Sequence, residues 1–325
     1  MGKSQALPAW SEAEHWRDVF AALSRTARPP EPLQVQEEWR RLAEINVHVD
    51  RWVAPQARAK IIVLHGSASH GRIMGALGWR LALFGYETLC PDLPGLGLSF
   101  GKRKRDLTYD DWREVAATLV EQERARGGDI YVYGHGLGGL LAFDTVALTG
   151  IGEGLILTHA LDPSRADVTE AVLGGFWRSR LTKLKLRLTP GALSGLSAGA
   201  GLAGEPHALT RDRGLREALA RDPRGGAARL STHFVRSWLA STPIKPPESF
   251  DICPVLFLRA GADAWAPPGA SEDFYARLSA TKRRVRLDTA DFFNLSGQGA
   301  DLHDHALSEF LSAICEHRPI PDHLV

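Results

Sequence analysis

The spacing of apolar residues changes along the chain, and these changes predict alternating strands and helices. Continuous apolar runs such as Ile61–Leu64 and Ile130–Tyr133 are typical of strands buried on both faces. Between such runs, apolar residues recur at helical spacing, as in residues 109–126. This alternation predicts βαβ units and a mostly parallel sheet. The same criteria predict strands at Thr88–Cys90, Leu155–Thr158, Val255–Leu258 and Arg284–Leu287, and helices at 74–84, 138–148 and Leu302–Cys315.

The N-terminal part of the chain has a different pattern. Residues 8–26 are predicted to form a leading helix, in which Ser11 and Glu14 have the spacing of a capping box. The proline-rich residues 28–32 end this helix. Residues Ile45–Val53 alternate between apolar and polar, which predicts a half-buried hairpin strand.

A long interruption separates two groups of predicted strands. From about Pro163 to Pro247 no clean strand pattern occurs, and helices are expected at 167–180, 212–220 and 226–240. An insertion of this kind would lie over the ends of the strands as a cap. The expected organisation is an N-terminal helical extension and linker at 1–44, a core at 45–162 and 248–325, and a helical cap at 163–247.

Composition narrows the class of protein without adding a function. The 325 residues are 44% hydrophobic and 24% charged, as in an average globular protein. The 39 Lys and Arg residues nearly balance the 38 Asp and Glu residues, so the net charge of +1 gives no indication that the protein binds nucleic acid. The three cysteines form neither a disulfide framework nor a zinc-binding pair, and no apolar run is long enough to span a membrane. We expect a cytoplasmic protein without a metal or cofactor; the sequence does not indicate its oligomeric state.

Three short motifs follow predicted strands. They read Leu-His-Gly-Ser at 64–67, Pro-Asp-Leu-Pro-Gly-Leu-Gly-Leu-Ser at 91–99 and Tyr-Gly-His-Gly-Leu-Gly-Gly at 133–139. An open α/β sheet binds its ligand at the carboxyl ends of its strands. The three motifs are therefore expected to meet at one site.

With these motifs in this order, the chain resembles the α/β-hydrolase family, and within it the monoacylglycerol lipase, lysophospholipase and serine aminopeptidase-like (S33) branch. The resemblance covers about residues 45–315. It implies an α/β-hydrolase fold, in which helices flank a mostly parallel central sheet and a helical cap is inserted. It also implies an ancestral activity, the serine-dependent hydrolysis of esters, thioesters or amides of lipid-like acyl compounds.

The chain differs from this family at the residues of the catalytic triad. In its nucleophile elbow, G-x-S-x-G, the central serine attacks the substrate, and here that position is Gly136. Glycine has no side-chain oxygen and cannot form an acyl-enzyme. The family's acid matches Asp263, but Phe292 occupies the best position for its histidine. The backbone N–H groups of Ser67 and Leu137 match the oxyanion hole.

The pocket at this site is expected to be bordered by His65, Gly66, His135 and Trp265. Ser67 and Ser99 are the hydroxyl groups nearest the strand ends, but neither is favoured as a substitute nucleophile. The side chains of His65 and His135 are expected to be structural. His303 and His305, which could replace the missing histidine, are instead expected at the surface or as helix caps, and Asp162 as a turn or cap residue.

The incomplete triad leaves three hypotheses open. The chain is an inactivated hydrolase, a non-hydrolytic enzyme that uses the oxyanion hole for cyclisation, isomerisation or elimination, or a protein that binds a small apolar or acyl ligand. A remote alternative is a dinucleotide-binding oxidoreductase. Gly134, Gly136 and Gly139 form a G-x-G-x-x-G pattern after a strand, and Asp162 follows at the distance of a ribose-binding acid.

Overall fold

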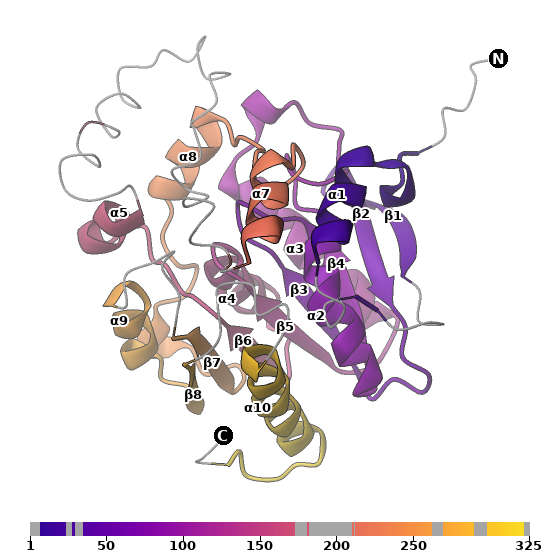
Figure 1. Ribbon diagram of the computed structural model, residues 1–325. Coiled ribbons are helices and arrows are strands. Elements are labelled where there is room, and N and C mark those ends of the chain that lie inside the picture. Colours follow the sequence, from indigo (N-terminus) through magenta and orange to yellow (C-terminus); the bar gives the residue numbers. More distant parts are fainter. Residues whose placement is uncertain are drawn as a thin grey trace.

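The computed structural model describes residues 7–23, 28–29, 35–172, 181, 210, 212–261, 269–288 and 298–321. One eight-stranded sheet organises them, with the strand order β1-β2-β4-β3-β5-β6-β7-β8 (Figure 1). From β4 to β8 neighbouring strands are parallel, whereas β2 runs antiparallel to β1 and β4. The strands are β1 Gln36–Leu42, β2 Ile45–Trp52, β3 Ala59–Leu64, β4 Tyr86–Pro91, β5 Ile130–Gly134, β6 Gly154–Leu157, β7 Val255–Ala260 and β8 Lys282–Leu287.

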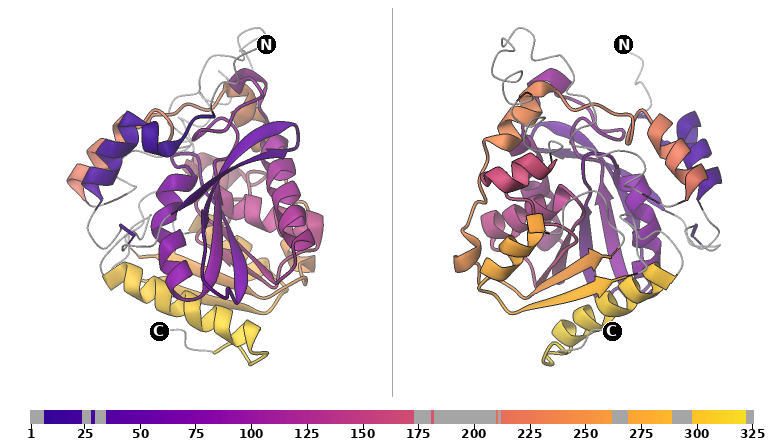
Figure 2. Two further views of the ribbon diagram at one scale, coloured as in Figure 1. Left: turned by 90° about the vertical axis from the view of Figure 1, so that its right-hand side faces the viewer. Right: turned by 60° about the vertical axis from the view of Figure 1, so that its left-hand side comes forward.

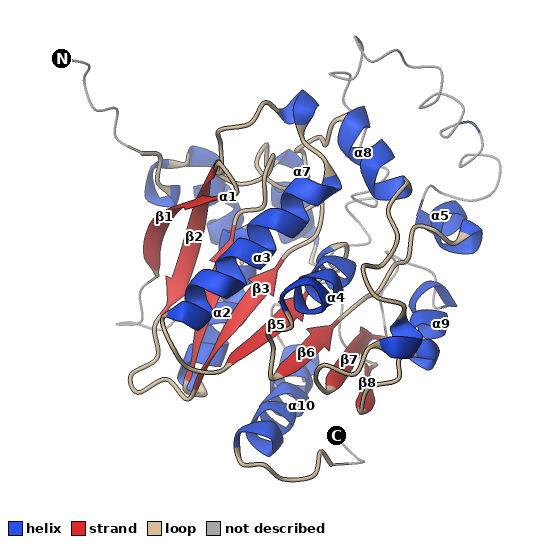
Figure 3. Ribbon diagram, turned by 180° about the vertical axis from the view of Figure 1, so that it is seen from behind, coloured by secondary structure: helices blue, strands red, loops and turns tan. Residues whose placement is uncertain are grey.

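Helices cover both faces of this sheet. The helices α3 and α4 lie on one face, and α2 and α10 lie on the other (Figure 3). Each face has its own apolar core, one around Trp112 and Phe143 and the other around Leu77 and Phe310. The helices are α1 Glu14–Ala22, α2 Gly71–Leu83, α3 Tyr109–Ala125, α4 Gly138–Thr149, α5 Ala166–Val172, α7 Arg213–Arg221, α8 Thr232–Leu239, α9 Gly269–Arg277 and α10 Gln298–Cys315.

The predicted parallel sheet and its flanking helices are confirmed, because the continuous apolar runs become strands buried on both faces. Two elements were not predicted. The first is strand β1, which consists mostly of charged residues. The second is helix α9, the next described element after β7. In the expected cap, α5, α7 and α8 lie between β6 and β7 in the chain.

The N-terminal segment differs from its prediction. Instead of one helix over 8–26, a short 3₁₀ helix at Trp10–Glu12 precedes α1. The residue before α1 is Ala13, which makes no side-chain cap, so the predicted capping box of Ser11 and Glu14 is wrong. The 3₁₀ turn instead buries Trp10, whose ring stacks on His70 with centroids 4.1 Å apart.

The N-terminal segment also changes the environment of β2. The alternation of Ile45–Val53 predicted one solvated face, yet almost every residue of β2 is buried. Its polar residues His48 and Asp50 are fully buried because they form ion pairs with Glu37 of β1 and Arg72 of α2. The prediction of a half-buried strand is therefore wrong.

Helix α1 also reaches the segment between β6 and β7. Both views in Figure 2 show α1 beside α7. Val19 of α1 and Leu23, the residue directly after α1, share an apolar cluster with Leu215 and Leu219 of α7 and with Ile73 of α2. The N-terminal segment thus links α7 to the core.

Candidate active site at the carboxyl ends of the strands

The sharpest turn of the candidate site connects β5 to α4. Gly136 stands at its apex with φ of +59°, a left-handed conformation that glycine adopts without strain. Its N–H donates a hydrogen bond to the Thr158 hydroxyl oxygen over 3.1 Å. Close packing around the turn requires small residues. A Cβ at Gly134 would lie 2.3 Å from the Gly138 carbonyl oxygen, and one at Gly139 would lie 1.7 Å from the His159 carbonyl oxygen.

The loop after β3 lies directly against this turn. A Cβ at Gly66 would be 3.1 Å from the His135 carbonyl oxygen and 3.2 Å from the Leu137 nitrogen. Leu137 is the N-cap of α4, where the backbone N–H groups and the helix dipole favour a negative charge. Ser67, the next residue in the loop, is also buried. The two segments expected to provide the oxyanion hole are therefore neighbours.

His65 is completely buried in the same loop. Its Nδ1 lies 2.7 Å from the Gly66 carbonyl oxygen, and its Nε2 lies 2.9 Å from the N–H of Leu93. An imidazole that donates through Nδ1 and accepts at Nε2 satisfies both contacts. Burial lowers the pKa of His65 to about 4, so the ring is neutral at pH 7. His65 thus joins the loops after β3 and β4, and the His135 side chain is buried as well.

The loop after β4 is held by Asp92. This buried carboxylate accepts hydrogen bonds from the N–H groups of Gly71 (2.7 Å) and Leu98 (2.9 Å) and from the indole of Trp10 (3.2 Å). Burial opposes its charge, but the hydrogen bonds from His48 and Leu98 and the nearby charges of His48 and His70 together outweigh this effect and lower the pKa of Asp92 to about 2. Asp92 of the 91–99 motif therefore has a structural role, because it holds the loop after β4 in place.

Ser99 ends this motif and is also engaged in the loop. Its hydroxyl donates to the Asp92 carbonyl oxygen (2.6 Å) and accepts from the His48 N–H (3.0 Å).

A hydroxyl and an imidazole that sequence reasoning missed lie beside the elbow. Thr158 and His159 follow β6, and the Thr158 oxygen lies 3.1 Å from His159 Nδ1. The same oxygen accepts the hydrogen bond from Gly136 N–H. Both residues are buried. The strand-end position of residues 158 and 159 was visible in the sequence, but no motif singled them out.

The expectation that His303 lies at the surface or caps a helix is wrong. Helix α10 begins at Gln298, earlier than predicted, so His303 falls on its buried face. Its Nε2 lies 3.0 Å from the Tyr133 hydroxyl and its Nδ1 lies 3.0 Å from an oxygen of Asp304. His305 is exposed, as expected.

Asp162 forms a local turn. One of its oxygens accepts hydrogen bonds from the N–H (3.0 Å) and the hydroxyl (2.5 Å) of Ser164. This agrees with its expected role as a turn residue. Asp263, Trp265 and Phe292, the remaining predicted site residues, lie outside the described residues.

A buried ionic network lies behind the loop after β4. His48 Nε2 is 2.9 Å from Glu37, and its Nδ1 is 3.3 Å from Asp92. Burial opposes the charge of this imidazole, but the hydrogen bonds to Asp92 and Glu37 raise its pKa to about 9. Glu37, His48 and Asp50 are close enough together to surround a metal ion. However, a protonated imidazole is no metal ligand, and Arg72 already pairs with both carboxylates.

The family model described as "Serine aminopeptidase, S33" (Hydrolase_4) matches residues 55–290, more than half of the chain. The chain belongs to this family. No curated protein matches it. The described residues include no helix that is both long and apolar enough to cross a membrane.

Solved structures of low sequence identity share the fold. A soluble variant of monoglyceride lipase from Saccharomyces cerevisiae is 15% identical, with a TM-score of 0.65 over 88% of this chain and 99% of that chain. The Paleococcus ferrophilus monoacylglycerol lipase is 22% identical, with a TM-score of 0.60 over 82% and 99%. DcsB, solved with its substrate analogue, is 12% identical, with a TM-score of 0.67 over 88% and 99%. These likenesses establish the α/β-hydrolase fold.

Proposed function

We propose that this member of the S33 family binds a small acyl or other carbonyl compound at the elbow and does not hydrolyse it through a serine acyl-enzyme. The observation that carries the proposal is Gly136 at the apex of an otherwise complete elbow. The backbone that would polarise a carbonyl oxygen is retained around Gly66 and Leu137, while the apex has no nucleophilic atom.

The magnitude of this loss supports binding without turnover. Removing the serine or the histidine of a triad lowers kcat by about 10⁶-fold, and the oxyanion hole and binding alone leave roughly 10³–10⁴-fold over water. Gly136 and Phe292 stand at both positions. Asp263 is then left without a histidine to orient.

The helical segment at 163–247 is proposed to cover this pocket as a cap. Its helices α7 and α8 come between β6 and β7 in the chain. An insertion at this point of the chain would cover the carboxyl ends of the strands. The chain is proposed to act in the cytoplasm on an apolar or acyl ligand, independently of nucleic acid.

The test is ester turnover by this protein and by Gly136→Ser/Phe292→His, on short- and long-chain p-nitrophenyl esters. We expect no turnover by the unchanged protein, and activity in the double variant that a fluorophosphonate abolishes. Gly136→Ala/Phe292→His is the matched control, because it carries the same strain of a side chain at positive φ without the hydroxyl.

Two outcomes would contradict the proposal. Fluorophosphonate-sensitive turnover by the unchanged protein would mean that another hydroxyl is the nucleophile. If the double variant folds, as judged by its melting temperature, and remains as silent as the alanine control, the assigned positions are wrong.

The Thr158–His159 pair favours a second candidate function, proton transfer on the bound carbonyl compound. In this candidate, His159 removes a proton next to the carbonyl and the oxyanion hole stabilises the enolate, as isomerisation or elimination requires. The test is hydrogen–deuterium exchange into a panel of small ketones and thioesters, followed by NMR in D₂O. Exchange that His159→Gln abolishes supports this function, and exchange that the variant leaves unchanged excludes it.

A further inference from the structure

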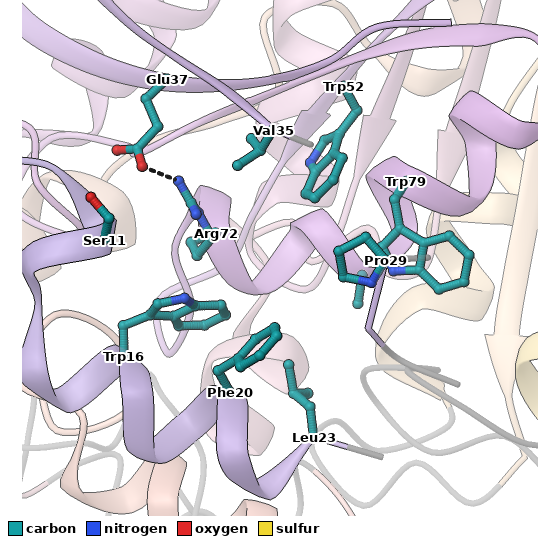
Figure 4. A pocket seen from close by; sticks show the side chains of 11 residues that line it. Ser11, Trp16, Phe20, Leu23, Pro29, Val35, Glu37, Trp52, Arg72 and Trp79 are labelled. Atoms are coloured by element: carbon teal, nitrogen blue, oxygen red, sulfur yellow. Dashed lines mark ion pairs between the residues drawn. The ribbon is translucent and has the colours of Figure 1, made fainter. Parts of the chain in front are cut away.

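A second cavity lies away from the strand-end motifs, between α1, α2 and the end of β2. It has a volume of about 320 Å³, within the range of small-molecule sites (Figure 4). Four aromatic side chains line it: Trp16 and Phe20 from α1, Trp52 from β2 and Trp79 from α2. None of its lining residues belongs to the motifs at 64–67, 91–99 or 133–139.

Arg72 provides the cationic group in the wall of this cavity. Its Nε and Nη2 atoms hold Asp50 at 2.6 and 2.8 Å, and Nη2 also lies 2.8 Å from Glu37. The guanidinium group is 6.0 Å from the Trp16 ring. Figure 4 shows Arg72 between Glu37 and the aromatic side chains. Of its nitrogens, Nη1 has no hydrogen-bond partner among the residues that the structure describes.

The pairing of these charges decides what kind of ligand fits. An anion would compete with Asp50 and Glu37 for Arg72, and a cation would meet the guanidinium group itself. Either would be desolvated without gaining an unpaired counter-charge from Arg72, Asp50 or Glu37. A neutral oxygen, in contrast, can accept a hydrogen bond from Nη1, which pairs with none of the described residues.

The walls decide the shape of the ligand. Phe20 lines the cavity and is 38% exposed, with the Arg28 guanidinium 4.9 Å from its ring centroid, whereas Trp52 and Trp79 are buried. The rings of Trp16 and Phe20 are tilted to each other, with centroids 6.1 Å apart. Flat rings gain from stacking and edge contacts with such side chains beyond the burial of area alone.

We propose that this cavity is a binding site for an uncharged, ring-containing apolar compound whose carbonyl or hydroxyl oxygen accepts a hydrogen bond from Arg72. The proposal does not rest on the function proposed for the elbow. It has a structural consequence, because α1 also packs against α7: a ligand between α1 and α2 would strengthen the attachment of α1 to the core.

The test uses prodan, an uncharged naphthalene ketone whose emission shifts to the blue in apolar surroundings. Titration into the full chain is expected to show saturable binding, with energy transfer from the tryptophans. Phe20→Ser is expected to weaken prodan binding about tenfold. Phe84→Ser is the matched control, since Phe84 is an exposed phenylalanine at the end of α2 and does not line the cavity.

Three results would overturn the proposal: no saturable binding of prodan, equal affinity in Phe20→Ser and the unchanged protein, or tighter binding of the anion 2-naphthoate than of prodan. Melting temperatures identify a variant that has not folded. If Phe20→Ser fails in this way, Phe20→Leu keeps the apolar volume of the side chain and removes only the ring. A loss of affinity for prodan in Phe20→Leu relative to Phe84→Ser then supports the aromatic site, and equal affinity in these two variants overturns it.

Discussion

The elbow and the β1–β2 edge of the sheet use their residues in opposite ways. At the elbow, the backbone conformation of Gly136 and the close packing of Gly134 and Gly139 are retained, but the apex has no reactive side chain. At the edge, His48 of β2 and its partner Asp92, which follows β4, are buried and charged, yet their partners are other residues of the chain. Perturbed pKa values mark functional sites in many enzymes. Here the shifted pKa values of His48 and Asp92 come from their pairing within the fold, and the candidate site is recognised by its backbone.

The largest expected effect concerns the edge. Asp92→Ala removes the acceptor of two backbone N–H groups and of the Trp10 indole, and leaves His48 buried without one counter-charge. We expect the free energy of unfolding to fall by about 3–5 kcal/mol. Urea denaturation measures it. Asp106→Ala, which removes a half-exposed carboxylate paired with Arg103, should change it by no more than about 1 kcal/mol. Equal effects of the two substitutions would mean that Asp92 does not organise this edge.

The next effect concerns the elbow. Gly139→Ala would place a Cβ 1.7 Å from the His159 carbonyl oxygen, so the start of α4 must move away from the end of β6. We expect a loss of about 3 kcal/mol, at the upper end of the cost of overpacking. At Gly269, the start of α9, a Cβ would meet nothing within 4 Å. Gly269→Ala should therefore leave stability unchanged or raise it by about 1 kcal/mol. A Gly139→Ala variant as stable as Gly269→Ala would show that the tight elbow is not required for folding.

The edge and the elbow are expected to change the stability with pH in opposite directions. The pKa of His48 rises from 6.5 to about 9 on folding, so its stabilisation is complete below pH 6.5 and is lost as the pH rises through 9. The shift corresponds to about 3 kcal/mol. In His48→Gln, the decline of stability between pH 6.5 and 9 should be smaller by this amount. Denaturation at a series of pH values measures the decline.

His65, beside the elbow, should act in the opposite direction. Its pKa falls from 6.5 to about 4, so the folded state keeps the ring neutral and its contribution is lost as the pH falls from 6.5 to 4. His65→Gln should reduce the decline on the acid side alone. If His48→Gln and His65→Gln altered the same side of the curve, the protonation states assigned to the two histidines would be wrong.

The sequence was sufficient for the parallel strands of the sheet and for the elbow because their signals are local. Continuous apolar runs such as Ile130–Tyr133 report a strand buried on both faces whatever its neighbours are. The glycines around Gly136 report a turn between a strand and a helix for the same reason. Both could be predicted without knowing any contact between distant residues.

The parts that could not be predicted all depend on contacts between distant residues. The charged strand β1 was not predicted, and β2 was predicted to be half-buried, but Glu37 of β1 and Arg72 of α2 pair with the polar residues of β2, which are buried. Likewise, Thr158 and His159 become neighbours of the elbow only because β6 pairs with β5.

The amino-acid sequence by itself thus determined the α/β-hydrolase fold and the absence of a side-chain nucleophile at Gly136, because a glycine lacks that atom in any conformation. Only the tertiary structure decided which charged groups are paired and buried, that His303 faces Tyr133, and that an aromatic cavity forms between α1 and α2. The physical reason is that charge pairing and cavities depend on distances between segments that folding alone brings together.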